Sequence, residues 1–96
     1  MKLLSVVRAH DGKHKYVAEV EMDNGRVRHT AFGAQGMDDY TLTHDPEQRA
    51  RYRQRHQKDL ATGDPTRAGF LSYHLLWGGS TSLRENIASY KKKYHL

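Results

Sequence analysis

The chain has 96 residues, with 16 Lys and Arg against 11 Asp and Glu, which gives a formal net charge of +5. A chain of this length supports one domain with one modest hydrophobic core. The lack of cysteine excludes disulfides, thiol chemistry and cysteine-based zinc sites. The positive charge favours a polyanionic partner, namely nucleic acid, anionic lipid or an acidic protein surface.

Three strands are predicted in the first third of the chain, at residues 3–9, 14–22 and 26–32. The turn signals Asp11-Gly12 and Asn24-Gly25 separate them, and Asn-Gly is typical of a two-residue type I′ hairpin turn. Two such hairpins make an antiparallel β-meander. With a two-residue loop at each turn, one face gathers apolar side chains and is expected to be core: Leu3, Val7, Tyr16, Ala18, Val20, Met22, Val27 and Ala31.

Three helices are predicted in the second half of the chain. Asp45-Pro46 begins a helix over residues 46–58, because Asp can cap a helix and Pro suits its first position. Asp64-Pro65 repeats this signal and opens a second helix that ends near Trp77. Ser82 caps the third helix. The apolar side chains of the third helix recur at helical spacing: Leu83, Ile87, Tyr90 and Tyr94.

The order of the predicted elements is three strands, a loop and three helices. Strands and helices that are segregated in this way form an antiparallel sheet with the helices packed on one face. We therefore predict one α+β domain, with a β-meander in residues 1–33, a glycine-containing loop in residues 34–44 and a helical part in residues 45–96.

No segment predicts a membrane span or a secretion signal. The apolar run at the N-terminus ends at Arg8, and no other stretch approaches the roughly 20 apolar residues that a span needs. We expect a protein that is neither secreted nor bound to a membrane.

The helix predicted at residues 46–58 is strongly basic, and Tyr52 is its only large hydrophobic residue. Arginines four residues apart on one helix repel each other, and an anionic partner would compensate them. Arginine binds phosphate through a planar fork, and aromatic rings among the cations could stack or form hydrogen bonds. The candidate binding residues of this helix are Arg49, Arg51, Tyr52, Arg53, Arg55, His56 and Lys58.

A second interpretation of these arginines stays open. Charge runs are usually solvated faces, and the arginines could instead pair internally with nearby carboxylates. The carboxylates in question are Asp38, Asp39, Asp45 and Asp59.

A second basic cluster lies in the last turn of the third predicted helix, where lysines also suit the helix dipole. Its candidate binding residues are Lys91, Lys92 and Lys93. Together the two clusters could form one positive surface that contacts phosphates without reading bases.

Seven histidines raise the question of a metal site. His44 and His56 flank the basic helix, but the spacings show no tight pair of ligands, and a metal-dependent nuclease needs several ligands on one ion. Gly33 and Gly36 match neither a phosphate-binding loop nor a dinucleotide fingerprint. We predict no catalytic residue, no metal and no cofactor.

Two runs of residues carry a recognisable pattern. The first comprises Phe32-Gly33-Ala34, Gly36, Asp39-Tyr40-Thr41, His44, Asp45, Arg49, Tyr52, Arg55 and His56. The second comprises Pro65, Ala68-Gly69-Phe70-Leu71-Ser72, Leu76-Trp77 and Tyr90. Together they resemble a family of small uncharacterised proteins from large DNA viruses of algae and protists. The resemblance implies a viral setting, in the host cytoplasm, the host nucleus or the virion. It also implies a hydrogen-bonded network that serves as a binding site or a structural lock: His44, Tyr52, Arg55 and His56.

The leading hypothesis is a non-enzymatic accessory protein that binds nucleic acid through backbone phosphates, without strong sequence specificity. One alternative is a structural component of a large assembly, such as a minor capsid or virion protein, which docks its Arg-rich helix on an acidic protein surface. A further alternative is a small metal-dependent nuclease. The sequence leaves the oligomeric state open.

Overall fold

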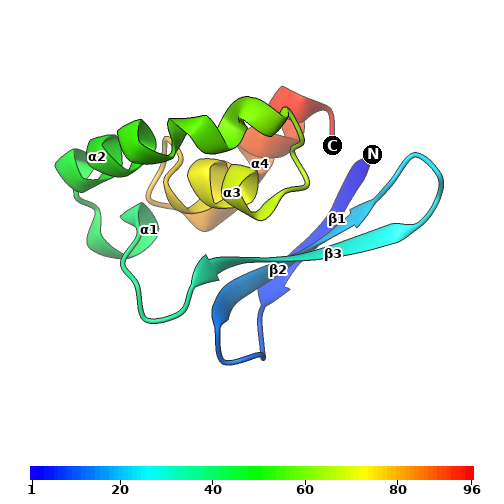
Figure 1. Ribbon diagram of the computed structural model, residues 1–96, viewed down its shortest axis with the longest axis horizontal. Coiled ribbons are helices and arrows are strands. Elements are labelled where there is room, and N and C mark those ends of the chain that lie inside the picture. Colours follow the sequence, from blue (N-terminus) through cyan, green and yellow to red (C-terminus); the bar gives the residue numbers. More distant parts are fainter.

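The computed structural model describes residues 1–96 and places a layer of helices over one face of a three-stranded sheet (Figure 1). The strands β1 (Lys2–Arg8), β2 (His14–Glu21) and β3 (Val27–Ala34) are antiparallel, in the order β1-β2-β3. The helical segments are α1 (Tyr40–Thr43), α2 (Pro46–His56), the 3₁₀ helix η1 (Gln57–Thr62), α3 (Ala68–Leu71), the π-helix η2 (Ser72–Leu76) and α4 (Leu83–Tyr94). The predicted α+β class, with a β-meander followed by helices on one face, is confirmed.

The turn between β2 and β3 is one residue longer than predicted. The Met22 N–H donates to the carbonyl of Arg26 at 2.7 Å, which leaves three residues in the loop. Only Gly25 has a positive φ, of 82°, whereas a type I′ turn needs a positive φ at Asn24 as well. The prediction of a two-residue type I′ turn is therefore wrong.

The longer turn exchanges the two faces of β3. Thr30 and Phe32 are buried under the helices, while Val27 is exposed and Ala31 is only partly covered. Side chains alternate along a strand, so a slip of one residue moves every side chain to the other face. The predicted core positions at Val27 and Ala31 are wrong for this reason.

The turn between β1 and β2 is also longer than the two-residue loop predicted at Asp11-Gly12, because the Ala9 N–H donates to the carbonyl of Lys15 at 3.0 Å. Val6 therefore lies opposite Ala18, and the faces of this part of β1 are exchanged. A β-bulge between Leu3 and Ser5 shifts the register again and returns Leu3 to the core face. Val6 accordingly packs against the core, and Val7 is 49% exposed. The prediction that Val7 belongs to the core is wrong.

The hydrophobic core lies between the sheet and the segment that contains α3 and η2. Its buried residues are Leu3, Ala18, Val20, Phe32, Phe70, Leu71, Leu75, Leu76, Trp77 and Tyr90. Three residues of the predicted core face are confirmed in it, namely Leu3, Ala18 and Val20, and two others pack against it, namely Tyr16 and Met22.

Two of the three predicted helix caps are confirmed. The Asp45 carboxylate accepts hydrogen bonds at the start of α2, and the Ser82 hydroxyl accepts one at the start of α4. Asp64 instead forms a turn, because its carboxylate accepts the N–H and hydroxyl of Thr66 at 2.9 and 2.7 Å. The helix that was predicted to start after Asp64 therefore begins at Ala68.

The segment predicted as a loop at residues 34–44 contains regular structure. The last strand continues through Ala34, and α1 follows after Asp39, whose carboxylate accepts the Thr41 N–H. The basic α2 comes directly after this short helix. None of the helices is both long and apolar enough to cross a membrane.

Candidate functional site

Two arginines of α2 point into the helical layer. The Arg49 Nε donates to the carbonyl of Gly78 at 2.6 Å. The Arg53 Nη1 donates to the carbonyls of Tyr73 at 3.2 Å and Trp77 at 2.7 Å. The last carbonyls of a helix have no partner within the helix, and cations stabilise that end. Arg49 and Arg53 therefore cap the carbonyl end of η2.

Aromatic rings hold the same two arginines. The guanidinium carbon of Arg53 lies 4.1 Å from the centre of the Tyr73 ring, and that of Arg49 lies 5.6 Å from the Tyr40 ring. A cation over an aromatic face is attracted by the ring quadrupole. Burial lowers the pKa of Arg53. These two side chains are thus part of the packing between α2 and η2.

Three of the four carboxylates that were considered as partners of the arginines are engaged elsewhere, and the fourth, Asp38, forms no ion pair. Asp39 pairs with Lys15 at 2.5 Å in a nearly buried contact, and Asp59 lies 3.0 Å from His56 Nδ1. Asp45 caps α2. No arginine of α2 forms an ion pair with a carboxylate, so the alternative of internal carboxylate pairing is wrong.

Tyr52 lies in an aromatic stack. Its ring is 4.3 Å from Trp77 at 8° and 4.2 Å from His56 at 23°, centre to centre. Burial, the largest influence, raises the pKa of Tyr52 to about 12. Both faces of the Tyr52 ring are covered, so this ring offers no free face to a base. His44 is exposed at the end of α1 and has no side-chain hydrogen bond to the stack.

The remaining candidate cations are free of carboxylate partners. Those on α2 and η1 are exposed to solvent. Of the three lysines on α4, Lys91 is partly covered and the other two are exposed. They are Arg51, Arg55, Lys58, Lys91, Lys92 and Lys93.

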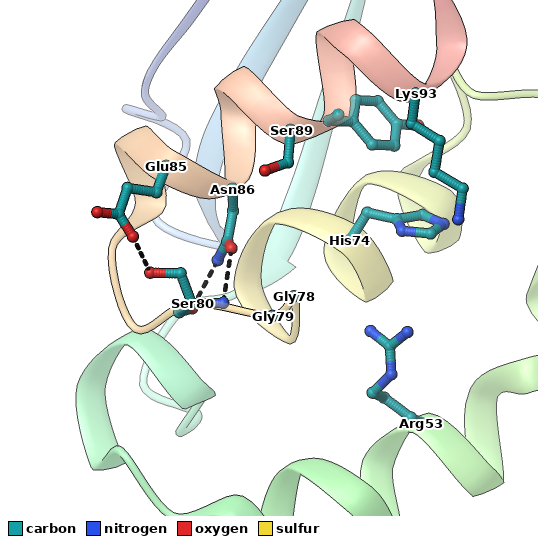
Figure 2. Close-up of a pocket in the computed structure, with 10 residues that line it drawn as sticks. Arg53, His74, Gly78, Gly79, Ser80, Glu85, Asn86, Ser89 and Lys93 are labelled. Atoms are coloured by element: carbon teal, nitrogen blue, oxygen red, sulfur yellow. Dashed lines mark hydrogen bonds between the residues drawn. The ribbon is translucent and has the colours of Figure 1, made fainter.

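A cavity of about 360 Å³ lies between one cation of α2 and one cation of α4 (Figure 2). Arg53 of α2 lines it from one side, and Ser89 and Lys93 of α4 line it from the other. The ring of His74, from η2, lies between these two cations in the view of Figure 2. One cationic side chain of α2, Arg53, and one of α4, Lys93, therefore line the same cavity.

The imidazole of His74 is a neutral wall of this cavity at pH 7. Burial is the main cause that lowers its pKa from 6.5 to about 4, followed by the positive charges of Lys93 and Arg53. Its Nε2 lies 3.1 Å from the hydroxyl of Tyr94. The neutral His74 ring therefore contributes no negative charge that could neutralise Arg53 and Lys93.

One family model, described as a family of unknown function (DUF5754), matches residues 4–56, which is more than half of the chain. The chain belongs to this family. The match covers most of the DUF5754 sheet together with α1 and α2. It leaves out η2 and α4, so only the Arg53 wall of the cavity lies in the matched part. The resemblance to a family of uncharacterised proteins is confirmed, because the matched family has no known function. No curated protein and no solved structure matches the chain.

Among the residues that line the DUF5754 cavity, sequence reasoning identified only Arg53 and Lys93, and those that it missed include His74 and Ser89. His74 stands in the mostly apolar run from Phe70 to Trp77, where a single histidine among core residues was the available signal. Ser89 had no signal, because one serine on a polar helix face is ordinary.

A second cavity, of about 520 Å³, lies between the loop after β3, α2 and Trp77. The Lys15–Asp39 ion pair forms part of its lining, and Arg55 is a cation there without a carboxylate partner. No group of three or more His, Asp or Glu side chains in the DUF5754 chain could hold a metal ion.

Proposed function

We propose that this DUF5754 protein binds nucleic acid through backbone phosphates, as an accessory protein without catalytic activity or strong sequence specificity. The observation that carries the proposal is that the exposed cations of α2, η1 and α4 form no ion pair with any carboxylate. Cations on these elements can then contact one polyanion, since phosphate contacts supply most of the sequence-independent affinity for nucleic acid.

The spacing of two exposed arginines supports the same conclusion. Arg51 and Arg55 lie four residues apart on α2, and such like charges repel. Neighbouring carboxylates do not neutralise them. A strand with one negative charge per nucleotide neutralises them and releases its own counterions. The covered faces of Tyr52 favour phosphate contacts over base stacking.

The proposed setting follows the sequence resemblance. It is a large DNA virus of algae or protists, with the protein in the host cytoplasm, the host nucleus or the virion. A virion protein that docks on an acidic protein would use the same cations, and the binding test separates this alternative.

The test is equilibrium binding to generic duplex and single-stranded oligonucleotides over a salt series that starts at about 50 mM. The proposal predicts binding to unrelated sequences with similar affinity and a steep fall in affinity as salt rises. A parallel incubation with and without a divalent chelator checks for cleavage. The proposal fails if neither nucleic acid binds at low salt, and binding to an acidic protein alone would favour the assembly component.

A further inference from the structure

The cavity between α2, η2 and α4 presents donors from two opposing helices (Figure 2). Two backbone carbonyls hold Nη1 of Arg53, so the guanidinium is fixed in place while its other N–H groups stay free of protein acceptors. Ser89 and Lys93 stand one helical turn apart on α4 and line the other wall. A small anion in the cavity can therefore reach a guanidinium, a hydroxyl and an ammonium group.

The only carboxylate in the lining is held away from these donors. Glu85 accepts a hydrogen bond from the Ser80 hydroxyl at 2.5 Å, at the end of the cavity beside Asn86. Arg53, His74 and Lys93 lie at the other end (Figure 2). The cationic end thus has two formal positive charges and no negative one.

His74 reports the charge of the cationic end. The titratable or charged groups around its ring are Tyr90, Lys93 and Tyr94 from α4, Arg53 from α2 and Tyr73 from its own helix. The positive charges of Lys93 and Arg53 add to burial in lowering the pKa of His74. An anion bound between those two cations would offset their charges and raise the pKa again.

We propose that this cavity binds the dianion of a phosphate monoester, the group found at a phosphorylated end of a nucleic-acid strand. Two cations match a monoester, whose charge at pH 7 is about −1.5 to −2, better than a backbone diester with its single charge. If the ligand is the end of a nucleic-acid strand, this inference rests on the proposed function. Free inorganic phosphate presents the same dianionic group to the cavity. The exposed cations then bind the backbone, and the cavity binds the terminal phosphate.

The first experiment compares two single-stranded oligonucleotides of identical sequence, one with a 5′-phosphate and one with a 5′-hydroxyl, by fluorescence anisotropy with the full chain. We expect the phosphorylated strand to bind at least about three-fold more tightly, as one additional charge-assisted contact implies. The preference is expected to disappear in Lys93→Gln and to persist in Lys92→Gln, a neighbouring lysine that does not line the cavity. Equal affinities in the unchanged chain, or a preference that survives Lys93→Gln, would overturn the inference.

The second experiment separates failure of the cavity from failure of the proposed function. Inorganic phosphate is titrated at about pH 8, where it is mainly a dianion, against chloride of equal ionic strength while the ring resonances of His74 are followed by NMR. We expect phosphate to shift these resonances in the unchanged chain and in Lys92→Gln, and to shift them less in Lys93→Gln. If no strand binds but phosphate shifts the resonances, the proposed function fails and the cavity stands. If strands bind but phosphate leaves the resonances unchanged, the cavity inference is overturned and the proposed function stands.

Discussion

Arg53 donates a hydrogen bond from Nη1 to the carbonyl oxygen of Trp77 at 2.7 Å, and this contact ties α2 to the end of η2. The same guanidinium lines the cavity that faces α4. One side chain thus contributes to the packing of the helices and presents a positive charge to a cavity. The arginines of α2 consequently fall into two groups, those that hold the fold and those that stay free.

Arg53→Ala is expected to lower the free energy of unfolding by about 2 kcal/mol. The backbone carbonyls of Tyr73 and Trp77 would lose a charged hydrogen-bond donor, and the Tyr73 ring would lose the cation over its face. Arg51→Ala, on the exposed side of the same helix, serves as the control and is expected to stay within about 0.5 kcal/mol of the unchanged chain. Urea denaturation followed by circular dichroism measures both. Equal losses in the two variants would contradict the division between the two groups of arginines.

The stack of Trp77, Tyr52 and His56 is expected to stabilise the contact between α2 and the core. Tyr52→Ala removes a half-buried ring from between two others, and we expect a loss of about 3 kcal/mol. Tyr52→Phe keeps the ring and is expected to cost less than about 1 kcal/mol. The two variants can be compared by thermal and chemical unfolding. If Tyr52→Phe were as unstable as Tyr52→Ala, the hydroxyl rather than the stack would carry the stability.

His74 makes the stability depend on pH in a defined window. Its pKa in the folded chain is about 4, below the ordinary value of 6.5, so the unfolded chain binds this proton more strongly. The contribution of the neutral ring is complete above pH 6.5 and is lost as the pH falls toward about 4. Comparison of the melting temperatures of the chain and of His74→Gln at several pH values isolates this group. A variant that loses stability over this window as steeply as the unchanged chain would rule out His74 as the cause.

Gly33 occupies a position where an added methyl group meets the core. Its φ is 76°, and a Cβ would lie 2.7 Å from Cδ1 of Leu76. Gly33→Ala is expected to cost about 2 to 3 kcal/mol through backbone strain and overpacking. Gly36→Ala has a similar φ of 83° but open space around it, so about 1 kcal/mol of backbone strain is expected. Equal losses in the two variants would show that the contact with Leu76 contributes nothing.

The sequence predicts the strands, the caps at Asp45 and Ser82 and the α+β class well, because turn and capping signals are local. It fails on which faces of β1 and β3 are buried. Two turns that are longer than two residues and a bulge after Leu3 decide those faces, and none of them follows from the alternation of polar and apolar residues. Asp64 fails as a cap because its carboxylate can equally close a turn with Thr66.

Part of the inward face of α2 could have been predicted. Arg49, Tyr52, Arg53 and His56 are spaced as one helical stripe, and Tyr52 is the only large apolar side chain in it. The carbonyls that receive the arginines could not have been predicted, because the π-helical turn of η2 sets their positions. His74 and Lys93 lie 19 residues apart, and only the packing of η2 against α4 brings them to one cavity.

The salt dependence of nucleic-acid binding tests most directly whether α2 and α4 present one phosphate-binding surface. Affinity for a short single strand is measured over a salt series for the unchanged chain, for Arg51→Gln with Arg55→Gln, and for Lys91→Gln with Lys92→Gln and Lys93→Gln. We predict that each set of changes lowers the affinity and reduces the slope of log affinity against log salt by roughly 0.7 for each lost phosphate contact. Arg26→Gln, in the turn between β2 and β3 and outside both clusters, is expected to leave the slope unchanged. Slopes that stay the same in both sets of variants would contradict the account.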